Sequence, residues 1–466
     1  MNKKCDLIIK GGKIFYDNKL QFNNIVINRG KIIAIQKNIQ LFKSDRIIDA
    51  KNKIVIPGII DIHFHVRAPS FPERGTVESE TRAAAKGGIT TLFEMPISDP
   101  CMSDAKVLLA RKKHFSSRAI INFAFIPAIG NFNNSNLQGL IKNGAIAFKV
   151  FTIAPPPNRK SEFNGLCYTK DQEILNALAH AKKSNLVTIF HAEDQTLLDY
   201  FKKNENKFQK SNPKVHNATR PAIVEAMAIT KILNLNSIVK TKVHIAHVTS
   251  ELSLDIISFF QNKGQDVTAE TCPHYLFKTE KDVLNVGPFG KINPPIRGES
   301  DQKQLWKALK NNILSIVASD HASFSYKEKI KGKKNFLNAP PGAPSGELML
   351  PLMLNAVSEK KITFKKMIQL MVINPAKRFN IFPKKGIIKK GSDADLVILD
   401  MNEVWSVNKN NLVSKGNKCA HLYYGDKIKG NIKTTIVNGK IAYDGKNFYK
   451  YNNMDLFVSP YKNTKL

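Results

Sequence analysis

Four histidines and one aspartate lie where apolar stretches of the sequence end. His63 and His65 end the first of these stretches, and His191, His247 and Asp320 end three later ones. Residues two apart in a β-strand share a face, so the imidazoles of His63 and His65 can point toward one site. Because neutral imidazole and carboxylate are preferred ligands of Zn²⁺, the set indicates a zinc site.

A lysine lies inside a further apolar stretch. Lys149 is the only charged residue of the run GAIAFKVF at residues 144–151. Burying an unpaired ammonium group is costly, so such a lysine needs an ion-pair partner or a chemical role. In the second case burial lowers its pKa and leaves a neutral amine, which carbon dioxide can convert into a carbamate. The two oxygens of a carbamate can bridge two metal ions, and both interpretations stay open on the residues alone.

The stretches that end in these residues alternate with helical patterns. Eight apolar, β-branched runs lie at 59–66, 89–95, 120–126, 145–151, 186–191, 242–248, 266–271 and 314–319. Helical stretches separate them, for example at 77–86, 171–183, 221–233 and 300–310. Eight successive strand–helix units predict an α/β fold, a (β/α)8 TIM-type barrel. In such barrels the chemistry lies at the carboxyl ends of the strands, where the candidate ligands are found.

Both ends of the chain read as short strands separated by turns. Strands are expected at 6–9, 25–28, 31–35, 53–56, 395–399 and 434–437, and Asn438-Gly439 is a hairpin signal. Neither end has enough apolar residues for an independent core. We therefore expect residues 1–56 and 384–466 to form one small β-sandwich domain, with the barrel at 57–383 inserted between them.

The motifs as a set resemble the cyclic amidohydrolases, the family of dihydroorotase, allantoinase and dihydropyrimidinase (hydantoinase). They are PGIIDIHFHVR (57–67), TRAAAKGGITT (81–91), ETCPHYL (270–276), KINPPIRG (291–298) and GSDADLVILD (391–400). The resemblance covers nearly the whole chain. It implies a hydrolase that opens a cyclic amide ring with two Zn²⁺ ions, although other divalent metals suit the same ligands.

The same resemblance assigns a role to each candidate ligand. It implies a first zinc held by His63 and His65, a second held by His191 and His247, a bridging carbamylated Lys149, and Asp320 completing the first site. Asp320 would also be the catalytic residue, taking a proton from the attacking hydroxide and passing it to the ring nitrogen.

The substrate ring is less clear from the sequence. Phe148-Lys149, the EMP motif at 94–96 and ETCPHYL favour an allantoinase-like enzyme, whereas Arg67, two residues after His65, matches the carboxylate-binding arginine of dihydroorotases. Ile97 stands where dihydroorotases commonly have an asparagine after Met-Pro, and Ile97-Ser98 departs from the asparagine that allantoinases have after MPL. Ala154 replaces the tyrosine of dihydropyrimidinases, which makes that activity a third alternative. Asn293 and His274 are further candidates for substrate binding, and a buried core histidine is an equal interpretation of His274.

Two other classes remain as alternatives. Some relatives of dihydropyrimidinase are non-catalytic scaffolds, but these have lost metal ligands, and this chain keeps all six. The other alternative is a hydrolase of linear amides, such as a dipeptidase or an N-acyl-amino-acid deacylase.

The composition limits the partners and the compartment. The net charge is +33, nearly all of it from lysine, and the densest cluster, at 327–334, contains no aromatic residue, so we expect no nucleic-acid binding. Five scattered cysteines predict reduced thiols. We see no signal peptide and no membrane-spanning run, and expect a cytoplasmic enzyme. By resemblance it is a homo-oligomer, a dimer or a tetramer, acting on a small cyclic amide.

Overall fold

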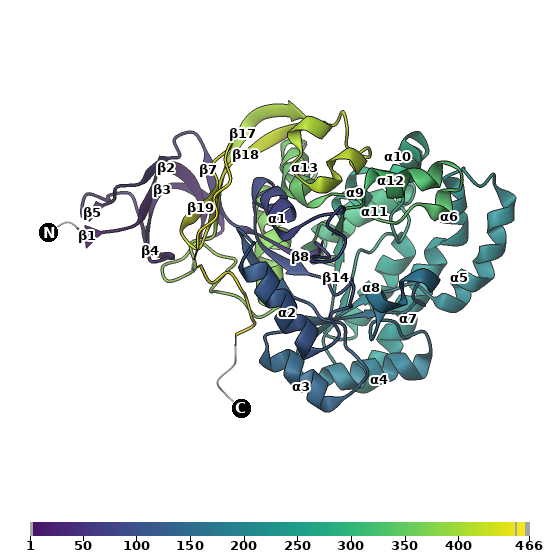
Figure 1. Ribbon diagram of the computed structural model, residues 1–466. Helices are drawn as coiled ribbons and strands as arrows, with labels where there is room; N and C mark the ends of the chain where they lie inside the picture. Colours follow the sequence, from purple (N-terminus) through teal and green to yellow (C-terminus); the bar gives the residue numbers. More distant parts are fainter. Residues whose placement is uncertain (1–2, 453, 462–466) are drawn as a thin grey trace.

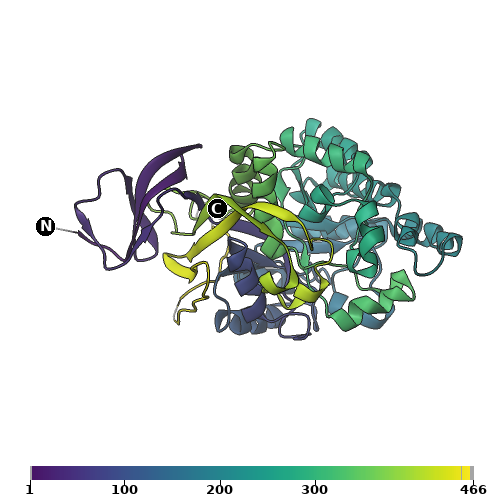
Figure 2. The ribbon, with the colours of Figure 1, turned by 90° about the horizontal axis from the view of Figure 1, so that it is seen from above.

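The computed structural model describes residues 3–452 and 454–461; the parts of the predicted end regions at 1–2, 453 and 462–466 lie outside the described residues. Strands β1–β7 form a small part beside a larger part in which strands and helices alternate (Figure 1). Strands from the C-terminal region lie between the two, as the view from above shows (Figure 2).

The strands of the larger part pair in parallel. They are β8 (Ile59–His65), β9 (Ile89–Glu94), β10 (Asn122–Phe125), β11 (Ala147–Phe151), β12 (Val187–His191), β13 (Val243–Ile245), β14 (Val267–Thr271), β15 (Ile316–Val317) and β16 (His321–Ala322). β8, β9 and β10 pair in that order, and so do β11 through β15. A bridge between Phe125 and Ala145 joins the two sets, and β16 pairs with β8. Parallel pairing thus runs through all eight predicted strand regions and returns to the first.

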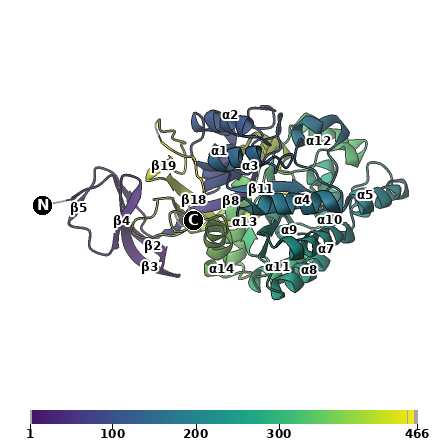
Figure 3. The ribbon, with the colours of Figure 1, turned by 90° about the horizontal axis from the view of Figure 1, so that it is seen from below.

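Helices lie around these strands, as the view from below shows for α2, α3, α4, α7, α8 and α11 (Figure 3). The helices are α1 (Val77–Lys86), α2 (Ala105–Ser116), α3 (Asn134–Lys142), α4 (Asp171–Lys182), α5 (Gln195–Phe201), α6 (Lys214–Thr219), α7 (Ala222–Val239), α8 (Glu251–Asn262), α9 (Pro273–Phe277), α10 (Glu280–Val286), α11 (Glu299–Lys310), α12 (Tyr326–Lys329), α13 (Gly346–Ser358), α14 (Phe364–Ile368) and α15 (Asn374–Arg378). Several begin at a side-chain cap; Asp104, for example, accepts a hydrogen bond from the Val107 N–H.

Neighbouring residues of one strand belong to different parts of the core. Ile60 and Phe93 belong to a cluster made mostly of strand residues, whereas their chain neighbours Ile59 and Leu92 pack in the cluster that includes the helices. Successive side chains of a strand point to opposite faces, so both faces are buried. This burial explains why the strand regions read as continuous apolar runs rather than as alternating ones.

The two ends of the chain pair with each other in one eight-stranded sheet. Its strands are β2 (Leu7–Tyr16), β3 (Lys19–Asn28), β4 (Lys31–Gln36), β6 (Ile47–Asp49), β7 (Ile54–Pro57), β17 (Leu396–Ser406), β18 (Lys427–Val437) and β19 (Lys440–Tyr443). The antiparallel pairing of β7 with β17 joins the ends. β1 (Lys3–Lys4) and β5 (Phe42–Lys43) form a separate two-stranded sheet. The described strands of the two chain ends therefore form one eight-stranded and one two-stranded sheet, and the sandwich arrangement stays a prediction.

One helical stretch meets the length and hydropathy of a membrane span, although none was expected from the sequence. It covers Lys214–Val239, and half of its most apolar window is buried inside the protein. Its longer part, α7, packs against α4 and α8. This burial is typical of a core helix. The five cysteines are free, and a cytoplasmic location stays a prediction.

Candidate metal centre and active site

Three of the predicted ligands form a compact buried group. His63 and His65 end β8, and Asp320 lies between β15 and β16; one ligand atom from each lies within 4.8 Å of the others. An oxygen of Asp320 is 3.2 Å from His63 Nε2 and 3.5 Å from His65 Nε2. Burial lowers the pKa of His65 to about 3, so its imidazole is neutral at pH 7 and offers a lone pair.

His191 and His247 form the second predicted pair. His191 Nδ1 lies 2.9 Å from His247 Nε2, and the His191 Nε2 lies 2.8 Å from a Glu193 oxygen. Because the Nε2 proton of His191 is engaged by Glu193, its Nδ1 carries a lone pair directed at His247. Burial lowers the pKa of both histidines, so both rings are neutral. The rings of His63 and His247 lie 5.4 Å apart between centroids, which places the second pair beside the first.

Lys149 lies on β11 and is fully buried. Its Nζ has no hydrogen-bond partner, and no carboxylate oxygen lies within 4 Å of it, in the part of the chain that the structure describes. Burial lowers its pKa to about 8, with Glu270 and Asp320 opposing that shift. The described residues therefore offer Lys149 no ion-pair partner, and its chemical role stays a prediction.

Carboxylates behind the histidines fix their orientation. Glu270, at the end of β14, lies 2.5 Å from His63 Nδ1 and 3.2 Å from His244 Nε2. A carboxylate on one imidazole nitrogen leaves the other nitrogen free to bind a metal. The sequence analysis did not single out Glu270 or Glu193. The sequence offered one indication of Glu270, because a glutamate at the end of an apolar strand region, as in ETCPHYL, is expected to be buried near the site.

The donor set fits divalent metal ions. Neutral imidazoles, a carboxylate and an unpartnered amine converge within the buried space, and carboxylates orient two of the imidazoles from behind. The nitrogens of His191 and His247, 2.9 Å apart, lie close enough for one metal ion to bind both after a small separation of the rings.

A cavity of about 720 Å³ opens above this centre. Its wall contains five predicted ligands, the four histidines and Asp320, and the two proline-rich segments at 154–157 and 339–342 also line it. Arg67 and Asn293 also line it. The oxygen of the Asn293 side chain is buried and has no hydrogen-bond partner in the described residues, so it remains available to a ligand.

Arg67 is held rigidly at the cavity wall. Glu94 accepts hydrogen bonds from the backbone N–H groups of Val66 and Arg67, at 2.7 and 2.8 Å. The Arg67 guanidinium donates to the Ser323 carbonyl and lies 4.5 Å from the ring centroid of Phe324. Burial, together with Arg159 and Arg74, lowers the pKa of Arg67 to about 9. No carboxylate of the described chain forms an ion pair with it, so its charge is available to a ligand.

His274 does not line the cavity. It is fully buried on α9, its ring lies 4.2 Å from that of Tyr275, and neither of its nitrogens has a partner among the described residues. Burial lowers its pKa to about 4. Its predicted role in substrate binding finds no support in this placement.

Comparison with known proteins identifies the family of the chain. A profile of the amidohydrolase family matches residues 54–442. The chain is 32% identical to a D-hydantoinase of Ralstonia pickettii, covering 94% of this chain and 95% of that one. It is 31% identical to an allantoinase of Bacillus licheniformis, covering 94% and 96%, and 31% identical to a dihydroorotase of Clostridium acetobutylicum, covering 91% and 95%.

Solved structures agree as well. The L-hydantoinase (dihydropyrimidinase) of Arthrobacter aurescens superposes with a TM-score of 0.90 and 28% identity, over 96% of this chain and 98% of that one. Profile, relatives and architecture agree over nearly the whole length, and the chain belongs to the amidohydrolase family.

Proposed function

We propose that this protein hydrolyses a carbon–nitrogen bond in the ring of a cyclic amide, with two zinc ions held on a closed (β/α)8 barrel. The observation that carries the proposal is the convergence of His63, His65 and Asp320 beside His191 and His247 at the base of one cavity. Relatives named hydantoinase, allantoinase and dihydroorotase support the reaction class, and the family is metal-dependent.

Lys149 supplies the bridging ligand in this proposal. Its neutral amine adds to the carbon of carbon dioxide and loses one proton, giving an N-carboxylate with a single negative charge. The absence of a buried counter-charge within 4 Å of Nζ, in the described residues, supports this role. His63 and His65 then hold one metal with Asp320, and His191 and His247 hold the other.

The reaction needs an activated water and a polarised ring carbonyl. Divalent metals supply both when bound, by lowering the pKa of water and by acting as Lewis acids. Asp320 accepts the proton of the attacking water and donates it to the leaving ring nitrogen. Asn293 binds the ring through its unpartnered side-chain oxygen, which suits a ring N–H donor.

The ring that best fits the relatives is the five-membered hydantoin ring. Allantoin is itself a hydantoin that carries a ureido substituent, so the allantoinase-like motifs and the hydantoinase relatives describe one ring chemistry. A cavity of about 720 Å³ has room for a ring and a substituent. A second candidate is dihydroorotate, because Arg67 offers an uncompensated cation at the cavity wall to the substrate carboxylate.

A substrate panel tests this proposal. Purified protein supplied with zinc and bicarbonate is assayed on hydantoin, allantoin, dihydroorotate and dihydrouracil, with an N-acyl amino acid as the linear control. We expect opening of hydantoin or allantoin. Opening of dihydroorotate alone would replace the hydantoin ring by the second candidate, with Arg67→Met abolishing turnover. Two results would contradict the proposal. One is hydrolysis of the linear amide alone, and the other is no hydrolysis of any substrate by protein that has two metal ions bound.

Assembly into a dimer or tetramer is also proposed. Apolar side chains are exposed on α7 and α8, among them Met227 and Phe259, at 41% and 55% of their surface. Exposed apolar groups clustered on neighbouring helices favour a protein interface. Light scattering on the eluted protein checks this; a monomer at micromolar concentration would contradict it.

A further inference from the structure

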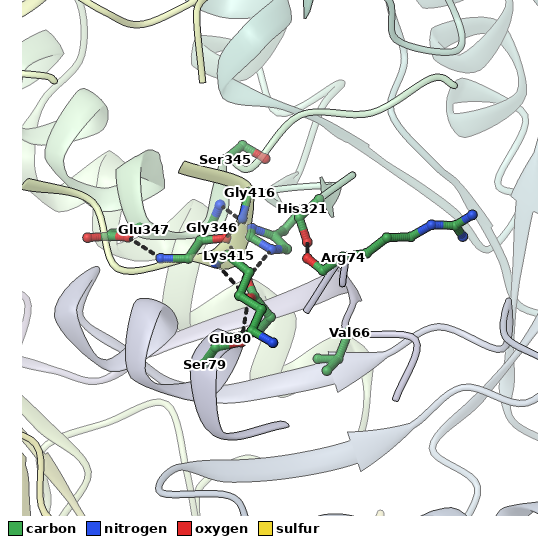
Figure 4. A network of polar contacts seen from close by, with 12 residues as sticks. Val66, Arg74, Ser79, Glu80, His321, Ser345, Gly346, Glu347, Lys415 and Gly416 are labelled. Atoms are coloured by element: carbon green, nitrogen blue, oxygen red, sulfur yellow. Dashed lines mark hydrogen bonds and ion pairs between the residues drawn. The ribbon is translucent and has the colours of Figure 1, made fainter. Parts of the chain in front are cut away.

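A buried glutamate joins the C-terminal part of the chain to the active site. Glu80 on α1 is fully buried, and its carboxylate accepts hydrogen bonds from His321 Nε2 at 2.9 Å, Ser414 Oγ at 2.6 Å and the Lys415 N–H at 3.1 Å. Figure 4 shows Glu80 below His321, with Lys415 and Gly416 beside the pair. Ser79 Oγ is a further donor, at 2.7 Å. The carboxylate is thus satisfied by residues of three separate segments.

His321 is fixed by these contacts in one orientation. Its Nε2 faces Glu80, and its Nδ1 accepts a hydrogen bond from the Gly346 N–H at 3.1 Å. These partners assign the proton to Nε2, because Nδ1 must offer a lone pair to Gly346. The ring also stacks on Phe64, with centroids 4.2 Å apart. A Cβ at position 346 would lie 2.5 Å from the Phe64 ring, so a glycine is needed there.

The residue that precedes His321 is Asp320, and its backbone is in the left-handed region, with φ of +45°. A non-glycine residue keeps this conformation only where its surroundings impose it. On the other side, Ser319 donates its N–H to Asp61 at 3.0 Å and accepts at its carbonyl from Ser345 Oγ at 2.6 Å. Asp320 is therefore held between two anchored neighbours.

We propose that Glu80 is a positioning residue, through which Ser414 and Lys415 hold His321 and thereby Asp320 in the geometry needed for proton transfer. The proposal rests on the function proposed above. It gives the C-terminal segment, which contributes no predicted ligand, an indirect part in the active site through Glu80 and His321. This role explains why a charged carboxylate, rather than an apolar group, is buried here. The carboxylate accepts hydrogen bonds from His321, Ser414 and Lys415 and so fixes their positions.

A matched pair of variants tests the proposal. Ser414→Ala removes the hydrogen bond to Glu80 and a second, weaker one that Ser414 Oγ accepts from the Gly416 N–H at 3.1 Å. Thr435→Val removes one buried hydrogen bond of similar length, from Thr435 Oγ1 to the Ala85 carbonyl at 2.6 Å, between the same C-terminal region and the end of α1, without touching Glu80 or His321. Glu80→Ala and Glu80→Gln complete the set. Alanine removes every acceptor of the carboxylate, whereas the amide of glutamine keeps one oxygen that can accept hydrogen bonds.

We expect Ser414→Ala to lower kcat about tenfold and Glu80→Ala about 100-fold on the ring that the wild type opens, with KM changed less than about twofold. Glu80→Gln should restore part of the loss, and Thr435→Val should keep wild-type kcat at a similar Tm to Ser414→Ala. Equal kcat in Ser414→Ala, Glu80→Gln and Thr435→Val, at equal metal content, would overturn the proposal.

A second readout does not depend on turnover. In cobalt-substituted protein the visible absorption reports the ligands of the metal, including Asp320. We expect an altered spectrum in Ser414→Ala, and in Glu80→Ala if it folds, with the wild-type spectrum in Thr435→Val. If the wild type opens no ring, the proposed function fails. The positioning role is tested separately, because an unchanged spectrum in Ser414→Ala and Glu80→Gln would refute it.

Discussion

The four histidines and Asp320 could be proposed as ligands from the sequence because each lies at the end of a strand region, whereas Lys149 was marked by its charge inside an apolar run. Glu270 and Glu193 could not be assigned in the same way, because their role depends on which imidazole nitrogen they contact. Glu80 was hidden inside an ordinary amphipathic helix. His274, for which the sequence left substrate binding and a core position open, lies outside the cavity wall, and its role stays a prediction.

Lys149→Arg tests the bridging role at the level of one residue. A guanidinium keeps its charge at any physiological pH and forms no carbamate, so the bridge is lost. We expect metal content to fall from two ions per chain to one or fewer, measured by mass spectrometry of the dialysed protein. Lys142→Arg, at an exposed position of α3, is the control. A full complement of metal in Lys149→Arg would refute the bridge.

Lys329 makes stability depend on pH. It is fully buried, donates to the Lys291 carbonyl at 3.1 Å, and burial lowers its pKa to about 7 from an ordinary 10.5. Between these values the unfolded chain binds more protons than the folded one, so the free energy of unfolding rises with pH, by up to about 1.4 kcal/mol per unit.

Removing this amine should flatten that rise. We expect the metal-free Lys329→Met protein to show a smaller increase in Tm than the metal-free wild type between pH 7 and pH 9, measured by calorimetry. Lys327→Met, two residues earlier on the exposed side of α12, is the control. Parallel curves for Lys329→Met and the wild type would show that Lys329 stays charged in the folded state.

At the scale of elements, every predicted strand region contains a strand, but the boundaries differ. β13 covers only three residues of the predicted 242–248, β15 covers two residues of the predicted 314–319, and β16 lies beyond that region, after Asp320. The left-handed backbone at Asp320 and at His247 interrupts regular pairing there. The pattern of apolar residues does not predict such backbone turns. These turns set the direction in which a functional side chain points.

The junction of β7 and β8 is a sensitive point of the fold. A Cβ at Gly58 would lie 2.0 Å from Thr90 Oγ1 on β9. We expect Gly58→Ala to lower the free energy of unfolding by about 1–3 kcal/mol through overpacking, measured by urea denaturation. Gly298→Ala, where the nearest atom is 3.9 Å away, is the control, and adding Thr90→Ala should recover part of the loss. Equal stability of the two alanine variants would contradict this packing account.

At the scale of the whole molecule, the sequence indicated that the two chain ends belong together, and the pairing of β7 with β17 joins them. It did not indicate that the C-terminal region also reaches the active site, because the contact of Ser414 with Glu80 spans 334 positions of the chain. Pairing between ends can be inferred from composition, since neither end has a sufficient core. A specific contact between two residues so far apart in the sequence cannot be inferred from composition.

Turnover by Asp320→Asn, compared with the wild type at equal metal content, tests the central claim most directly. The asparagine oxygen can still bind a metal, but the amide cannot accept and pass on the proton, so we predict a loss of kcat of about 100-fold or more on the ring that the wild type opens. Undiminished ring opening by metal-loaded Asp320→Asn would contradict the account.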